Sequence, residues 1–101
     1  MVQKTKMELI SVVKNNEKYV IIFSSNYHGY YIEQLFKRNE IKNTLRKAPI
    51  SIAKSCHYAI YIQDKDLEKA LELLKNSRIS PQGIYEIIEI SGYITYKKLH
   101  I

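Results

Sequence analysis

The sequence contains a single cysteine, Cys56, and this scarcity excludes two kinds of chemistry. A lone cysteine cannot form a disulfide within the chain, and it cannot run a two-thiol redox cycle without an outside thiol. Cys56 and the three scattered histidines His28, His57 and His100 lack the spacing of metal ligands, so no metal site is expected. A phosphate-binding loop, a paired-carboxylate site and a catalytic triad are missing as well, and no cofactor is expected.

Long apolar runs are missing as well. No stretch approaches the roughly 20 apolar residues of a membrane span, and the first residues lack the apolar core of a signal peptide. The chain is 46% hydrophobic and 26% charged, as is usual for a soluble globular protein. We therefore expect one domain of 101 residues in the reducing cytoplasm, with no membrane partner.

Positive charge is concentrated in the first half of this basic protein. Residues 1–56 contain ten Lys/Arg and four Asp/Glu, whereas residues 57–101 contain six of each, so the net charge of +6 lies before residue 57. A basic surface favours an anionic partner, such as nucleic acid, an acidic protein face or a small anion. The alternative is a solvated basic face that has no specific partner.

Two continuous apolar runs predict the central strands of a sheet. Residues 19–23 form a continuous β-branched and aromatic run and residues 58–62 a second continuous apolar run, as in strands that are buried on both faces. The polar segment 43–48, which ends before Pro49, predicts an edge strand. Residues 84–90 follow a turn and predict a last strand.

Two helices are expected between these strands. Ser24, Ser25 and Asn26 are N-cap candidates for a helix that continues to about Asn39. Asp64 is the expected cap of a second helix. The predicted inner face of the first helix holds His28, Tyr31, Ile32, Leu35 and Phe36, and that of the second holds Leu67, Ala70, Leu71 and Leu74.

This order of elements predicts an α+β fold of the ferredoxin-like β-α-β-β-α-β type. It would have an antiparallel four-stranded sheet with both helices on one face. The core is expected over residues 18–90, with peripheral extensions at residues 1–17 and 91–101. Two segments stay open: residues 7–13 fit a helix or a strand, and residues 93–99 also fit an extra edge strand after the Ser91-Gly92 turn.

The expected topology places Cys56 beside the start of the first helix. The first and third strands are neighbours and antiparallel, so the end of one meets the beginning of the other. A helix N-terminus favours anions, and nearby cations lower the pKa of a thiol below its usual value of about 8.5. An inert, buried cysteine is the alternative. The residues expected around the thiol are Ser24, Ser25, Asn26, Arg46, Lys47 and Lys54.

Several motifs resemble a small bacterial family, the selenium/sulfur carrier protein-like proteins. The resemblance covers about residues 18–88, and its most specific element is a proline-containing hairpin that leads into Ser-Cys and an apolar strand. It implies a cytoplasmic protein that holds sulfur or selenium on Cys56 as a persulfide or selenosulfide, between donor and acceptor proteins. The matching residues are Phe23-Ser-Ser, Glu33, Ala48-Pro49, Ile52, Ser55-Cys56, Ala59-Ile60 and Gly83-Ile-Tyr85.

One position departs from the family pattern. Family members typically have glycine immediately after the cysteine, and this chain has His57. An imidazole there can act as a base or as a partner of the thiolate, or it can be an ordinary surface histidine. His28, on the first turn of the first helix, is a second candidate neighbour of the sulfur.

Two other functions compete with the carrier. The first is a module that binds nucleic acid or an acidic protein, which nine tyrosines and a basic half favour. Nucleic acid is the less favoured of these partners, because the aromatic RNA-binding motif of ferredoxin-like sheets is missing. The second is a regulatory domain that forms homodimers through its sheet edges, with Cys56 incidental. A carrier or binding protein is favoured over a turnover enzyme.

Overall fold

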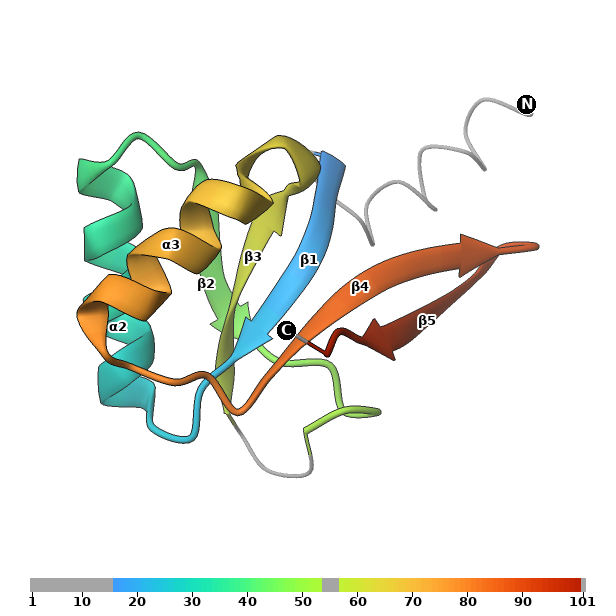
Figure 1. Cartoon of the computed structure of the whole chain (residues 1–101). Coiled ribbons are helices and arrows are strands. Elements are labelled where there is room, and N and C mark those ends of the chain that lie inside the picture. The colour runs from blue at the N-terminus through green and yellow to red at the C-terminus, as the bar shows by residue number, and fades with distance from the viewer. Residues whose placement is uncertain (1–15, 54–56, 101) are drawn as a thin grey trace.

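The computed structural model describes residues 16–53 and 57–100, which form an α+β fold with one antiparallel sheet (Figure 1). The sheet has five strands in the order β2-β3-β1-β4-β5. Helices α2 and α3 lie together on one face of it. The strands are β1 (Glu17–Ile22), β2 (Asn43–Lys47), β3 (Tyr58–Gln63), β4 (Gly83–Ile90) and β5 (Tyr93–Lys98), and the helices are α2 (Asn26–Arg38), the 3-10 turn η2 (Asp64–Asp66) and α3 (Leu67–Ser77).

The fifth strand corrects the expected four-stranded sheet. Ser91 and Gly92 both adopt positive φ, 51° and 84°, which is the geometry of a tight two-residue hairpin turn. The turn brings Tyr93 opposite Ile90, and β5 continues along β4 to the pairing of Lys98 with Tyr85. The alternative interpretation of residues 93–99 as an extra edge strand is therefore confirmed.

The central strands are buried on both faces, as their continuous apolar runs predict. Tyr19 and Ile21 of β1 contact the core beneath the helices, whereas Val20 and Ile22 contact a second core on the opposite face. Residues 48–53 and β5 contribute partly buried side chains to that second core, namely Ala48, Ile52, Ala53, Ile94 and Tyr96.

Helix α2 is rotated relative to the expected inner face. Its buried residues are Gly29, Ile32 and Phe36. Tyr31, expected inside, is 44% exposed, and His28 is only half-buried. Ile32, Leu35 and Phe36 pack on the core as predicted, whereas Gly29, and not His28, is the first buried residue of the helix.

Helix α3 begins later than predicted. Asp64 does not cap it; residues 64–66 form a 3-10 turn, and the Asp64 carboxylate accepts a hydrogen bond from the Tyr19 hydroxyl at 3.1 Å. Ala70 and Leu74 are buried in the core under the helices, in agreement with the predicted stripe. In the described part of the chain, neither helix is long and apolar enough to span a membrane.

Candidate functional site

The site expected from the sequence surrounds the connection between β2 and β3. Cys56 and Lys54 lie outside the described residues, so their placement stays a prediction. The backbone on both sides of them is described. The Ala48 N–H donates to the His57 carbonyl at 2.8 Å, so the β2–β3 ladder continues one residue beyond β2. Cys56 is therefore bonded to a residue whose backbone position is fixed by the sheet.

The beginning of α2 is tied to the beginning of β3. The Tyr58 N–H donates to the Asn26 side-chain oxygen at 3.1 Å, and Tyr58 is two residues after Cys56. The Ser25 hydroxyl caps the helix by accepting a hydrogen bond from the Tyr27 N–H at 3.1 Å. Ser24 is exposed on the connection before it. The structure thus brings the helix N-terminus close to the residues that follow Cys56, as the predicted topology requires.

Exposed aromatic rings surround this helix start, and sequence reasoning missed them. Tyr27 is 74% exposed, Tyr30 51% and Tyr31 44%. The ring of Tyr30 lies 6.3 Å from that of Tyr58, and the ring of Tyr27 lies 6.1 Å from His28. We call Tyr27, Tyr30, Tyr31 and Tyr58 the tyrosine patch. Helical i, i+3, i+4 spacing outside the Ile32 and Phe36 stripe is the signal that reveals its three helical members.

Arg46 does not contribute to the site as expected. Its guanidinium donates two hydrogen bonds to the Glu17 carboxylate, at 2.9 and 2.8 Å, and lies 3.6 Å from the centre of the Tyr61 ring. Arg46 pairs with Ala59, whose side chain belongs to the core opposite the helices. The charge of Arg46 is therefore balanced by Glu17 on the sheet face opposite the helices, away from the start of α2.

Lys47 is the described cation that remains beside the site. It pairs with Tyr58 across the β2–β3 ladder, and its side chain is exposed. Within residues 16–53 and 57–100, no ion pair involves Lys47. An uncompensated positive charge next to the tyrosine patch favours an anion or a thiolate there.

Tyr61 of β3 contacts the end of β2, and its ionisation makes the stability of this strand pair depend on pH. Its hydroxyl donates to the Lys47 carbonyl at 2.8 Å. Burial raises the pKa of Tyr61 to about 12, although Arg46 acts in the opposite direction. The folded protein therefore favours the neutral phenol. This contribution to stability is complete below pH 10, the ordinary tyrosine pKa, and is lost as the pH rises through 12.

We accordingly expect Tyr61→Phe to remove the part of the pH dependence that Tyr61 causes. Urea unfolding at pH values from 9 to 12 measures this pH dependence, and phenolate absorbance follows the ionisation of the tyrosines. The pH range covers the ordinary and the raised pKa of tyrosine. Wild type should lose more unfolding free energy than the variant between pH 10 and 12. Equal losses, or a Tyr61 that ionises with the exposed tyrosines, would show that burial does not control this group.

Metal chemistry finds no support in the described residues. No group of three or more His, Asp or Glu side chains in residues 16–53 and 57–100 is arranged to hold a metal ion. His28 and His57 are both half-buried.

No curated protein and no solved structure matches the sequence. A family model does match: the family described as "Putative Se/S carrier protein-like", over residues 18–86. The matched segment runs from β1 into β4 and includes Cys56, the helix start and the tyrosine patch. The chain therefore belongs to this selenium/sulfur carrier protein-like family.

Proposed function

We propose that the protein carries sulfur or selenium on Cys56 as a persulfide or selenosulfide and passes it between partner proteins. The observation that supports this most directly is the hydrogen bond between Asn26 and Tyr58, which holds the start of α2 beside the residues that follow Cys56. The first turn of α2 has no acidic residue, so nothing there offsets the partial positive charge of the helix N-terminus. Lys47 adds a full positive charge nearby.

The transfer needs no added oxidant. The Cys56 thiolate attacks the terminal sulfur of a donor persulfide, a new S–S bond forms on Cys56, and the donor's S–S bond breaks to release the donor thiolate. An acceptor thiolate then attacks the same terminal sulfur, and Cys56 leaves as a thiolate. Because Cys56 is the only cysteine, each step requires a thiol from another molecule.

The tyrosine patch is the proposed contact surface for donor and acceptor proteins. Tyrosine is enriched at protein interfaces because it buries a large ring and keeps a polar group for hydrogen bonds. The patch lies on the start of α2 and β3, on both sides of the helix-to-strand hydrogen bond. A partner that contacts it would bring its own thiol to Cys56. Lys47 favours a partner with an acidic surface.

Two finer assignments accompany this proposal. The strand order β2-β3-β1-β4 with α2 and α3 supports assigning the core to the ferredoxin-like type, with β5 as an added edge strand. A reducing compartment, the cytoplasm, suits a carrier whose single thiol must be regenerated.

Alkylation of Cys56 over a range of pH tests whether its thiol has the reactivity of a carrier. The rate should titrate with a pKa below the ordinary value of about 8.5, because the helix N-terminus and Lys47 stabilise the thiolate. Asn26→Ala should shift the titration to higher pH, since it releases the helix start from β3. Gln34→Ala, which removes an exposed amide further along α2, is the matched control and should leave it unchanged.

The alternative is a binding module for an anionic partner, with Cys56 incidental. The exposed tyrosine patch and Lys47 would serve that role equally well. A folded protein whose Cys56 titrates at the ordinary thiol pKa, or resists alkylation, would favour this alternative over the carrier.

A further inference from the structure

Strands β4 and β5 continue beyond the rest of the sheet. β1 pairs with β4 only from Gly83 to Glu86, whereas β5 pairs with β4 as far as Ile90. Residues 87–90 and 93–96 therefore form a two-stranded extension, which projects to one side in Figure 1. A two-stranded ribbon is marginally stable by itself in water, and three or more strands are needed for independent stability. A further strand beside β5 would therefore stabilise this extension.

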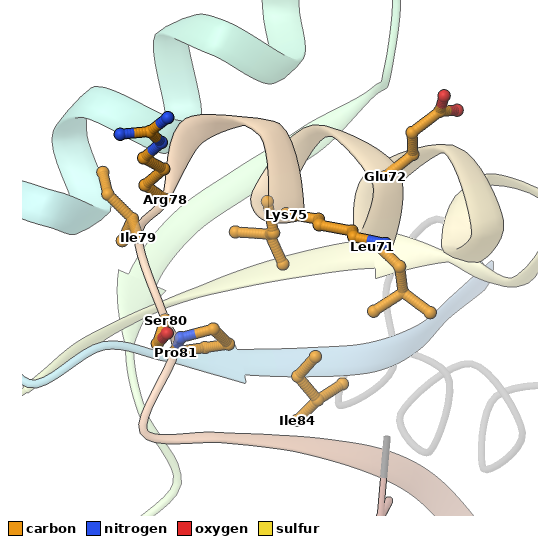
Figure 2. A pocket seen from close by; sticks show the side chains of 9 residues that line it. Leu71, Glu72, Lys75, Arg78, Ile79, Ser80, Pro81 and Ile84 are labelled. Atoms are coloured by element: carbon orange, nitrogen blue, oxygen red, sulfur yellow. The ribbon is translucent and has the colours of Figure 1, made fainter.

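The outer edge of β5 is open to such a strand. β5 is the last strand of the sheet, and no strand of the described part of the chain pairs with its outer side. Both helices lie away from this edge in Figure 1. An apolar groove of about 590 Å³, lined by Leu71 and Ile84 among others, separates α3 from the beginning of β4 (Figure 2). The helices therefore do not obstruct the β5 edge.

The backbone of β5 directs alternate residues toward this edge. In an antiparallel ladder, the N–H and C=O groups of one residue point to one neighbouring strand, and those of the next residue point to the other side. The Leu99 N–H donates to the Ile84 carbonyl at 2.8 Å, so the odd-numbered residues of β5 form their hydrogen bonds with β4. The N–H and C=O groups of Ile94, Tyr96 and Lys98 therefore point outward, away from β4.

A second copy of β5 fits this edge when the two strands run antiparallel about a two-fold axis at Thr95. Thr95 then faces the partner's Thr95, and Ile94 faces the partner's Tyr96. Since the backbone groups of Ile94 and Tyr96 both point outward, the two facing residues exchange N–H···O=C hydrogen bonds. Tyr93 faces the partner's Lys97. The two residues of each facing pair lie on the same face of the sheet, as antiparallel pairing requires.

The side-chain pairs in this register are favourable. An aromatic ring opposite a β-branched side chain, and two threonines opposite each other, both stabilise antiparallel strands. Ile94 and Tyr96 pack on the core opposite the helices, so this core would continue from one copy into the other. The Tyr93 ring is 75% exposed. The ammonium group of the partner's Lys97 can lie over it, as cations do over aromatic faces.

The positive charges of β5 do not oppose a second copy in this register. Lysines on an edge strand commonly prevent pairing with another chain. Lys97 and Lys98 both lie at the end of β5, and antiparallel copies keep them at opposite ends of the interface. Lys97 faces the partner's Tyr93, and Lys98 faces the partner's Gly92. We propose that the protein forms a symmetric homodimer in which the two β5 strands pair about Thr95 and join both sheets into one.

Sedimentation at increasing protein concentration tests this dimer, with Thr95→Lys as the interface variant. Thr95 is exposed, so the variant should fold like wild type, but it places two like charges directly opposite each other. We expect wild type to convert from monomer to dimer and Thr95→Lys to weaken the association at least tenfold. Thr44→Lys, the same change on the other edge strand β2, is the matched control and should dimerise like wild type. A wild type that stays monomeric, or a Thr44→Lys variant that weakens the association as much or more, overturns the proposal.

Cysteine cross-linking tests the register of the pairing. In a Cys56→Ser background, Thr95→Cys introduces the only thiol of the chain, so the result is independent of the carrier proposal. Residues that face each other without hydrogen bonds have Cα atoms roughly 4.5 Å apart, which a disulfide can span. Air oxidation should link Thr95→Cys chains into covalent dimers, whereas Lys97→Cys, on the same face of β5 but away from the axis, should stay unlinked. Thr95→Cys chains that stay unlinked, or Lys97→Cys chains that link as fast, overturn the proposed pairing.

Discussion

Arg46→Ala is expected to lower the free energy of unfolding by about 3 kcal/mol, the cost of leaving a buried charge without its partner. The Glu17 side chain is 4% exposed and accepts both guanidinium hydrogen bonds from Arg46. Without Arg46, this buried carboxylate would have no ion-pair partner among the described residues. The value is at the low end of the range for buried pairs because the Arg46 side chain is 35% exposed.

The Tyr61 ring adds to the same loss. The Arg46 guanidinium lies 3.6 Å from its centre, and a cation over an aromatic face contributes about 0.5–2 kcal/mol. One double variant tests the contribution of the ion pair. Arg46→Leu combined with Glu17→Leu removes both charges and should recover most of the stability, since apolar replacements of buried ion pairs are often neutral or stabilising.

Arg38→Ala is the matched control for these measurements. Arg38 lies in the last turn of α2, is exposed, and forms no ion pair with the described residues. Its removal should change the free energy of unfolding by about 0.5 kcal/mol or less. If urea denaturation shows that Arg46→Ala costs no more than Arg38→Ala, the ion pair with Glu17 does not stabilise this sheet.

The elements themselves were predictable from local patterns. Residues 19–23 and 58–62 are apolar at every position, which is typical of a strand buried on both faces, and β1 and β3 are neighbours inside the sheet. Ser25 was among the N-cap candidates of α2 and is its cap. These features depend on neighbouring residues in the sequence, and for that reason sequence patterns reveal them.

Features that depend on distant residues could not be predicted in this way. The partner of Arg46 is 29 residues away on β1, on the far side of β3, so its charge was assigned to the cysteine region. The Asp64 carboxylate accepts a hydrogen bond from the hydroxyl of Tyr19, which is 45 residues away, and α3 begins later than expected. In both cases a tertiary contact overrode a local preference.

The sequence predicted which segments lie close together at the candidate site, but not which side chains are exposed there. The topology placed the helix start beside the third strand, and the Asn26–Tyr58 hydrogen bond agrees with it. The tyrosine patch was missed because Tyr31 was assigned to the inner face of α2. Gly29 is the first buried residue of α2, and because it has no apolar side chain the sequence pattern does not reveal that position as buried. Cys56 itself lies outside the described residues, so its role rests on the family and on the residues around it.

Cys56→Ser is expected to abolish carriage completely, the largest effect that any single substitution should have on function. Serine keeps the size of the side chain but cannot form a persulfide, so folding should be unaffected. Because no other cysteine exists, a sulfur atom found on the protein can be assigned to Cys56 without mapping. Far-UV circular dichroism and thermal unfolding should show the variant and wild type to be alike.

The most direct test of the carrier proposal is the intact mass of the protein after incubation with a persulfide-forming cysteine desulfurase and cysteine. Release of sulfide to a small thiol confirms in parallel that the desulfurase is active. We predict that wild type gains the mass of one sulfur atom, that a reducing thiol removes it, and that Cys56→Ser gains nothing. A folded wild type that gains no sulfur from the active desulfurase, or a Cys56→Ser protein that gains as much, would contradict the proposal.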